Sequence, residues 1–110
     1  MTMADETKPK VDPLIDMIAY QEASVVSRQL IKKKTGNVTV FAFDEGEGLS
    51  EHTAPFDALV YVIDGEVEIT IAKDVYQLKK GETIIMPADI PHTLKAVKQF
   101  KMMLIMIKEG

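Results

Sequence analysis

Short apolar runs separated by turn-forming residues constrain this sequence more than any other feature. From residue 24 onward, Gly, Pro, Asn or Asp interrupt runs of β-branched and aromatic residues at intervals of roughly 8–12 residues. This spacing is typical of strands in β-sandwiches and β-barrels. We therefore predict an all-β domain with eight strands, at residues 24–33, 38–44, 58–63, 66–72, 75–78, 83–86, 93–97 and 100–108.

Residues 64–71 predict local structure in more detail. Residues 66–71 alternate polar and apolar side chains without a break, which indicates a strand with one wet and one dry face. Asp64 and Gly65 precede this strand, and both tolerate the positive φ of a type I′ turn. We therefore predict a tight hairpin here, in which Val60 and Val67, or residues near them, pair.

The N-terminal part of the chain has a different composition. Residues 1–13 are polar and contain two prolines, whereas residues 14–23 contain enough apolar side chains for one or two helical turns or an irregular edge segment. A chain of 110 residues with 46% hydrophobic content buries one core. We predict an N-terminal tail or edge segment over residues 1–23 and one β-barrel domain over residues 24–110.

Two predicted strands, residues 58–63 and 102–107, are apolar on both faces. A strand with two apolar faces needs cover on both sides. We interpret the outer face as the contact surface of a homodimer. The alternative is that the N-terminal tail folds over this face.

Charge and composition exclude several functions. The 13 basic and 17 acidic residues give a net charge of -4, which argues against a nucleic-acid partner. The chain has no cysteine, so disulfides, thiolate metal sites and cysteine nucleophiles are absent. The longest apolar stretch, residues 102–107, is too short to span a membrane, and the N-terminus lacks an apolar leader. We expect a cytoplasmic protein without a membrane partner.

The two histidines, His52 and His92, lie in segments with regularly placed glycine and proline. The chain here resembles the cupins, whose first motif contains Gly, two His, Glu and Gly, and whose second contains Gly, Pro, Gly, His and Asn. Six positions match at the family's spacings: Gly46, His52 and Gly65 in the first motif, and Gly81, Pro87 and His92 in the second. The resemblance covers roughly residues 24–108 and implies a double-stranded β-helix, or jelly-roll, barrel that often forms homodimers.

The same comparison shows what this chain has lost. Ala54 and Ala58 stand where cupins have the second histidine and the glutamate of the first motif, and Asp89 and Ala96 replace the glycine and asparagine of the second. The resemblance therefore carries over only His52 and His92 as ligands for Zn, Mn, Fe or Ni. Stable sites generally have at least three protein ligands. Asp57 is next to the lost glutamate, but strand alternation turns it away if Ala58 points inward.

The two alanines also remove polar groups that would be costly to bury without a metal, and they free volume. We predict a ligand pocket lined by His52, Ala54, Ala58, His92 and Met103. In the alternative, large side chains such as Phe41, Phe43 or Met103 fill this space.

These residues favour a barrel that binds a small organic molecule, without catalysis or with weak catalysis. The alternative is a metal-dependent isomerase, lyase or oxygenase that acts on a sugar acid or a related metabolite.

Overall fold

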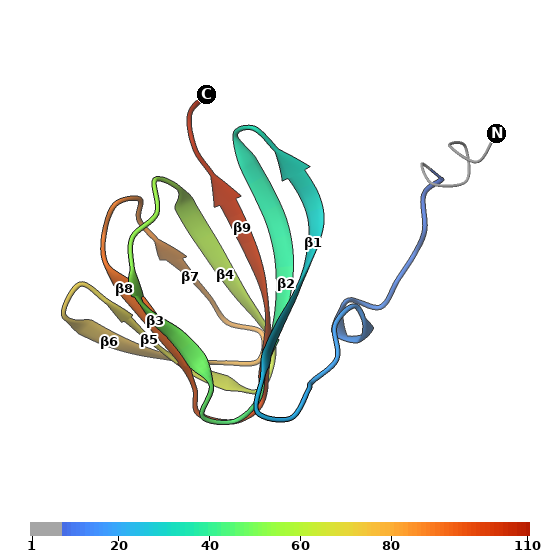
Figure 1. The fold of residues 1–110 in the computed structure, drawn as a ribbon, viewed down its shortest axis with the longest axis horizontal. Helices are drawn as coiled ribbons and strands as arrows, with labels where there is room; N and C mark the ends of the chain where they lie inside the picture. The colour runs from blue at the N-terminus through green and yellow to red at the C-terminus, as the bar shows by residue number, and fades with distance from the viewer. Residues whose placement is uncertain (1–7) are drawn as a thin grey trace.

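The computed structural model describes residues 8–110, which form two antiparallel β-sheets that face each other and spread apart toward one end (Figure 1). The five-stranded sheet has the order β1-β2-β9-β4-β7, and the four-stranded sheet has the order β3-β8-β5-β6. The strands are β1 (Val25–Lys33), β2 (Gly36–Phe43), β3 (Gly48–His52), β4 (Asp57–Asp64), β5 (Glu66–Ile71), β6 (Asp74–Lys79), β7 (Thr83–Met86), β8 (His92–Ala96) and β9 (Phe100–Ile107). The predicted all-β jelly roll is confirmed, and β3 is a ninth strand that the sequence pattern did not reveal.

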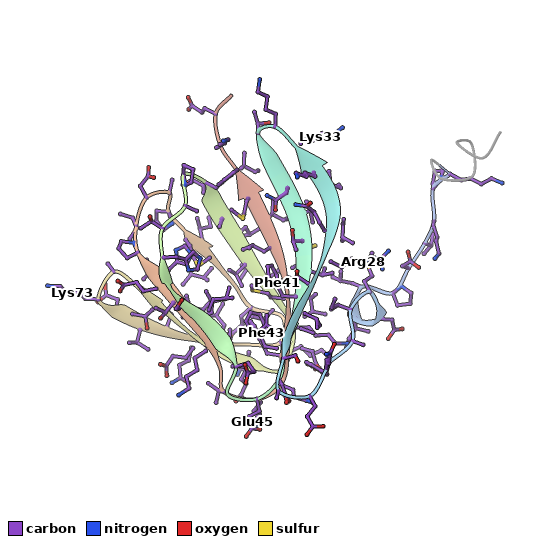
Figure 2. The ribbon with its side chains drawn as sticks, viewed as in Figure 1. Arg28, Lys33, Phe41, Phe43, Glu45 and Lys73 are labelled. Carbon is purple, nitrogen blue, oxygen red and sulfur yellow. The ribbon has the colours of Figure 1, made fainter. Side chains whose placement is uncertain are left out.

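The core lies between the two sheets, and strand alternation selects its residues. Phe100, Met102 and Leu104 of β9 point inward, as do Val67 and Ile69 of β5, whose alternating pattern predicted one buried face. Phe41 and Phe43 project from β2 toward the same space (Figure 2).

The rings of Phe43 and Phe100 meet edge to face within this core, with centroids 4.6 Å apart. Such aromatic pairs are worth about 0.5–1.5 kcal/mol beyond the area that they bury. Phe43 therefore packs in the core beside the start of β9, whereas Ala58 lies opposite Met106 near the end of that strand.

The turn at Asp64 and Gly65 differs from the prediction. β4 pairs with β7 and β9, whereas β5 pairs with β6 and β8, so Val60 and Val67 are not partners. Gly65 has φ of +79°, as the turn signal required, but the turn carries the chain from one sheet to the other. A Cβ at Gly65 would lie 1.8 Å from the carbonyl oxygen of Gln99, so only glycine fits this crossing.

The segment before β1 packs on the outer face of the five-stranded sheet. It contains a short 3-10 helix, η1 (Leu14–Asp16). Lys101 Nζ donates a hydrogen bond to the carbonyl oxygen of Ile15 at 2.6 Å, and Arg28 donates to that of Met17 at 3.3 Å.

Tyr20 fixes the end of this segment. Its hydroxyl donates to Asp64 Oδ2 at 2.7 Å, and the ammonium of Lys101 lies 5.0 Å from the centre of its ring. Three effects raise the pKa of Tyr20. Burial is the largest, and the hydrogen bond to Asp64 and the negative charge of Asp64 follow. The tyrosine therefore stays a hydrogen-bond donor at all physiological pH values.

The segment explains why two outward-facing residues are buried. Val40 and Ala42 of β2 alternate away from the core, yet both have no exposed surface. Their cross-strand neighbours Arg28 and Lys101 hold the segment in place above them. Of the predicted tail over residues 1–23, residues 1–7 lie outside the described part of the chain. In residues 8–110, no helix has the length and apolar character needed to cross a membrane.

Candidate functional site

His52 and His92 meet at the end of the barrel where the sheets are farther apart, which we call the open end. His52 is the last residue of β3, His92 is the first of β8, and the two are cross-strand partners. Their Nε2 atoms are 3.0 Å apart, and the two rings are inclined at 71°. The structure therefore brings these two predicted pocket residues together.

An irregularity in β3 brings His52 to this position. Leu49 pairs with Leu94 and points inward, so regular alternation would turn Glu51 inward and His52 outward. The register shifts between Leu49 and His52, with two residues on β3 opposite one on β8. This bulge turns His52 to the inner face, where it meets His92.

Both rings are oriented by main-chain carbonyl groups. Nδ1 of His52 lies 2.7 Å from the carbonyl oxygen of Ser50, and Nδ1 of His92 lies 3.2 Å from that of Ile90. A carbonyl oxygen only accepts hydrogen bonds, so each Nδ1 carries a hydrogen. In the neutral rings, both Nε2 atoms therefore present lone pairs to each other.

The environment of His92 favours its neutral form. His92 is 7% exposed, whereas His52 is open to solvent. Burial is the larger of two effects that lower the pKa of His92, and the charge of His52 is the other. The hydrogen bond to the carbonyl oxygen of Ile90 partly opposes them by raising this pKa. When both rings are neutral, their facing Nε2 atoms need a hydrogen-bond donor from another molecule.

The alanines at the lost ligand positions both lie near this end. Ala58 is on the inner face of β4 and is part of the core. Ala54 is half-buried in the loop before β4, where its carbonyl oxygen accepts a hydrogen bond from the amide of Asp89 at 2.8 Å. Four of the five predicted pocket residues thus lie at the open end: His52, Ala54, Ala58 and His92.

The structure places Met103 elsewhere. Phe100, Met102 and Leu104 point into the core, so alternation along β9 turns Met103 to the outer face of the sheet. It pairs there with Val40 and Tyr61. Met103 neither lines nor fills the barrel interior, and its place in the predicted pocket is corrected.

Three further apolar residues, not among the five predicted pocket residues, are cross-strand partners of Ala58 or His92. Met86 and Met106 are the cross-strand partners of Ala58, and Ile71 is the partner of His92. All three belong to the core or pack against it. Because residues 102–107 of β9 are apolar on both faces, the sequence pattern did not identify Met106 as an inward residue.

The carboxylates near the histidines do not complete a metal site. Asp57 accepts a hydrogen bond from the amide of Ala88 at 2.9 Å, so it caps the loop after β7. Glu51 is exposed on β3, and Asp89 is exposed in a turn with φ of +63°. Within residues 8–110, no group of three or more His, Asp or Glu side chains has the arrangement of a metal site. Two imidazoles alone do not fit the three or four protein ligands of a resident metal.

Comparisons with known proteins agree with this architecture. The family model described as the cupin domain matches residues 39–108. A conserved protein of unknown function from Streptococcus pyogenes is 37% identical, with a TM-score of 0.90 over 94% of this chain and 90% of that one. A cupin 2 conserved barrel domain protein from Leptotrichia buccalis is 41% identical, with a TM-score of 0.84 over 86% of this chain and 46% of that one. An RmlC-like cupin protein from Desulfovibrio desulfuricans, 19% identical, shares the fold with a TM-score of 0.77 over 91% and 97% of the two chains. The chain belongs to the cupin family.

Proposed function

We propose that this cupin binds a small organic molecule at the open end of its barrel. The facing Nε2 atoms of His52 and His92, 3.0 Å apart, carry the proposal. Each Nδ1 is held by a carbonyl oxygen, so both Nε2 lone pairs are available for a ligand. A hydroxyl or N–H group of the ligand would donate to one or both nitrogens and remove the repulsion between them.

The surroundings of the histidines support a ligand with an apolar body. Ile71 is the cross-strand partner of His92, and Met86 and Met106 are the partners of Ala58, so these side chains offer only carbon and sulfur atoms around the predicted pocket residues. Thioether side chains adapt to ligands of irregular shape. A few convergent polar groups in an apolar surrounding are the usual composition of a small-molecule site. We place this binding function in the cytoplasm, in keeping with a chain that has no cysteine.

The alternative is a metal-dependent isomerase, lyase or oxygenase that holds Zn, Mn, Fe or Ni with His52 and His92. It requires at least one further ligand, and the neighbouring carboxylate of Asp57 is engaged with the amide of Ala88. Ala54 and Ala58 offer no ligand atoms from their side chains. Ligand binding therefore has the stronger support from the geometry.

Elemental analysis of tag-free protein separates the two functions. We expect well below one equivalent of transition metal per chain. Near-stoichiometric metal that is lost when both histidines are replaced by alanine would overturn the binding proposal in favour of the enzyme.

Phenol serves as a probe for the binding proposal because it combines an apolar ring with one hydroxyl donor. We expect phenol to shift the ring NMR signals of both histidines, and the double variant His52→Ala, His92→Ala to bind it about tenfold more weakly or worse, as loss of a hydrogen bond to a buried partner predicts. Benzene, which lacks the donor, should not distinguish wild type from variant. Lys95→Ala is the matched control, since Lys95 is exposed on the same strand as His92. Equal affinity of phenol for wild type and double variant would contradict the proposed role of the histidines.

A further inference from the structure

A row of side chains on the inner face of the four-stranded sheet joins the two histidines to a carboxylate. His52, His92, Ile71 and Asp74 are successive cross-strand partners on β3, β8, β5 and β6. Leu78 of β6 belongs to the core, and the pairing of β6 with β5 has no irregularity, so alternation turns Asp74 to the inner face as well. We call these four partners the histidine–aspartate row.

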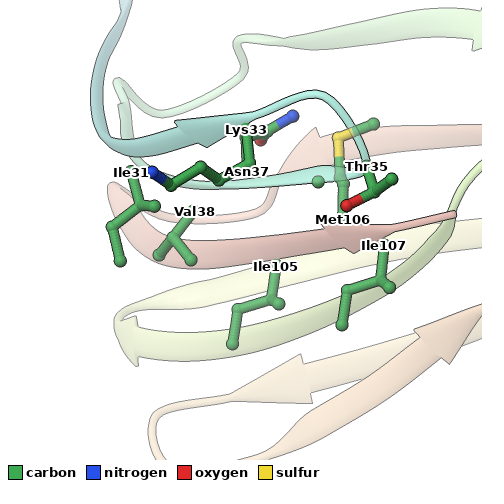
Figure 3. A pocket seen from close by; sticks show the side chains of 9 residues that line it. Ile31, Lys33, Thr35, Asn37, Val38, Ile105, Met106 and Ile107 are labelled. Carbon is green, nitrogen blue, oxygen red and sulfur yellow. The ribbon is translucent and has the colours of Figure 1, made fainter. Parts of the chain in front are cut away.

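An apolar row on the five-stranded sheet lies at the same end of the barrel. Met106, Ala58 and Met86 are successive cross-strand partners on β9, β4 and β7. Met106 projects from the opposite side of β9 to Ile105 and Ile107, and so it faces the barrel interior (Figure 3). The loops after β3 and after β7 join the two rows, which places both at the open end. A ligand there would have only carbon and sulfur side-chain atoms on the side of the five-stranded sheet.

The space deeper in the barrel is filled. Leu94 and Ile69 are the next inward pair on the four-stranded sheet, and they are 3% and 0% exposed. Val60 and Leu104, the next inward pair on the five-stranded sheet, are also buried. An elongated ligand bound to the histidines therefore extends sideways, across the strands of the histidine–aspartate row.

The Asp74 end of this row is open to solvent. β6 and β7 are the edge strands of their sheets and do not pair with each other. Between them lies a groove of about 410 Å³, lined in part by Tyr76 and Ile84. Asp74 directly precedes the β6 residues that line the groove, and it is exposed. Neither of the ion pairs within residues 8–110 includes Asp74, so its carboxylate has no cationic partner in this part of the chain.

We propose that the ligand is an elongated amine whose ammonium group binds Asp74 and whose other end donates a hydrogen bond to Nε2 of His52 or His92. This inference rests on the proposed function and adds the chemical class of the ligand. An ammonium group brings three donors and a positive charge to a carboxylate that lacks both. His92 and Asp74 are two strand spacings apart, about 10 Å, so the ligand needs an apolar middle part that passes Ile71.

Tyramine and 4-ethylphenol test the proposal, because both carry a phenol hydroxyl and only tyramine carries an amine. Isothermal titration calorimetry of the full chain measures their affinities. We expect Asp74→Asn to weaken tyramine binding roughly twofold to fivefold, as loss of a solvent-exposed ion pair predicts, and to leave 4-ethylphenol binding unchanged. Glu68→Gln is the matched control. Glu68 lies between the core residues Val67 and Ile69, so it points to the outer face of the same sheet, and its replacement should affect neither compound.

A second measurement locates the bound amine. Nuclear Overhauser contacts should join the methylene protons of tyramine to the methyl groups of Ile71; contacts to Thr70, on the outer face, would overturn the proposed position. Equal tyramine affinity of wild type and folded Asp74→Asn would overturn the assignment of an amine and leave ligand binding by the histidines intact. If neither compound nor phenol binds wild type, the proposed function fails, and this inference fails with it.

Discussion

His52 and His92 are cross-strand partners whose rings meet edge to face, with centroids 4.3 Å apart. Each ring is held by a carbonyl oxygen two residues before it in the chain. The two imidazoles therefore act as one unit with room for a single proton or a single donor between them. Their coupling leads to two predictions about pH.

We expect His52→Ala to raise the pKa of His92 toward its ordinary value. The charge of His52 is one of the two effects that lower this pKa, and the variant removes it while burial of His92 remains. An NMR titration of the His92 ring signals measures the change. Lys95→Ala removes the same amount of charge from the outer side of the strand and should leave the pKa nearly unchanged; an equal response in both variants would contradict the coupling.

We expect the protein to lose stability as the pH falls below about 6.5, the ordinary histidine pKa. The folded protein resists protonation of His92, whereas the unfolded chain accepts the proton, so the unfolded state binds more protons in this range. The contribution is fully present above that pH and is lost as the pH falls toward the folded pKa of His92. Urea unfolding of wild type and His92→Asn at several pH values measures it. Parallel stability curves for the two proteins would show that His92 is not responsible.

We expect Gly65→Ala to destabilise the protein much more than Gly81→Ala. Both glycines have positive φ, at +79° and +88°, so alanine at either position costs about 1–2 kcal/mol in backbone strain. At Gly65 the new Cβ also meets the carbonyl of Gln99, whereas nothing lies within 4 Å at Gly81. The collision should add roughly 1–3 kcal/mol. Thermal and chemical unfolding measure both changes, and equal losses would disprove the close approach.

We expect Tyr20→Phe to lower the free energy of unfolding by about 1–2 kcal/mol, since it removes a hydrogen bond to a charged acceptor. The hydroxyl of Tyr20 donates to Asp64 and holds the N-terminal segment on the sheet. Tyr76→Phe, at an exposed position of β6, should cost almost nothing. Urea unfolding compares the two, and a similar loss in both would leave the anchoring role of Tyr20 without support.

The sequence predicted the strands well because their residues follow short-range patterns. It missed β3, where Leu49 is the only apolar side chain among five residues. It also misjudged Asp64 and Gly65, because a turn signal reports the local backbone conformation and not the partner of the next strand. The positive φ at Gly65 is present, but the strand that follows joins the other sheet.

The direction of the site's side chains could be predicted from strand alternation only where one residue of the strand is known to point inward. Ala58 points inward and Asp57 does not, as expected from strand alternation. Met103 was misplaced because β9 is apolar on both faces, so its pattern does not reveal which residues point inward. The inward turn of His52 depends on the bulge before it, which no spacing of residue types announces.

That bulge lets β3 carry one extra residue and keep the histidine pair. Loss of a single residue between Leu49 and His52 would restore regular pairing, and the histidine, then two positions after Leu49, would still point inward. A regular β3 and a bulged β3 therefore present the same two imidazoles, and relatives of this protein should be compared by which residue lies opposite His92 as well as by the spacing of their motifs.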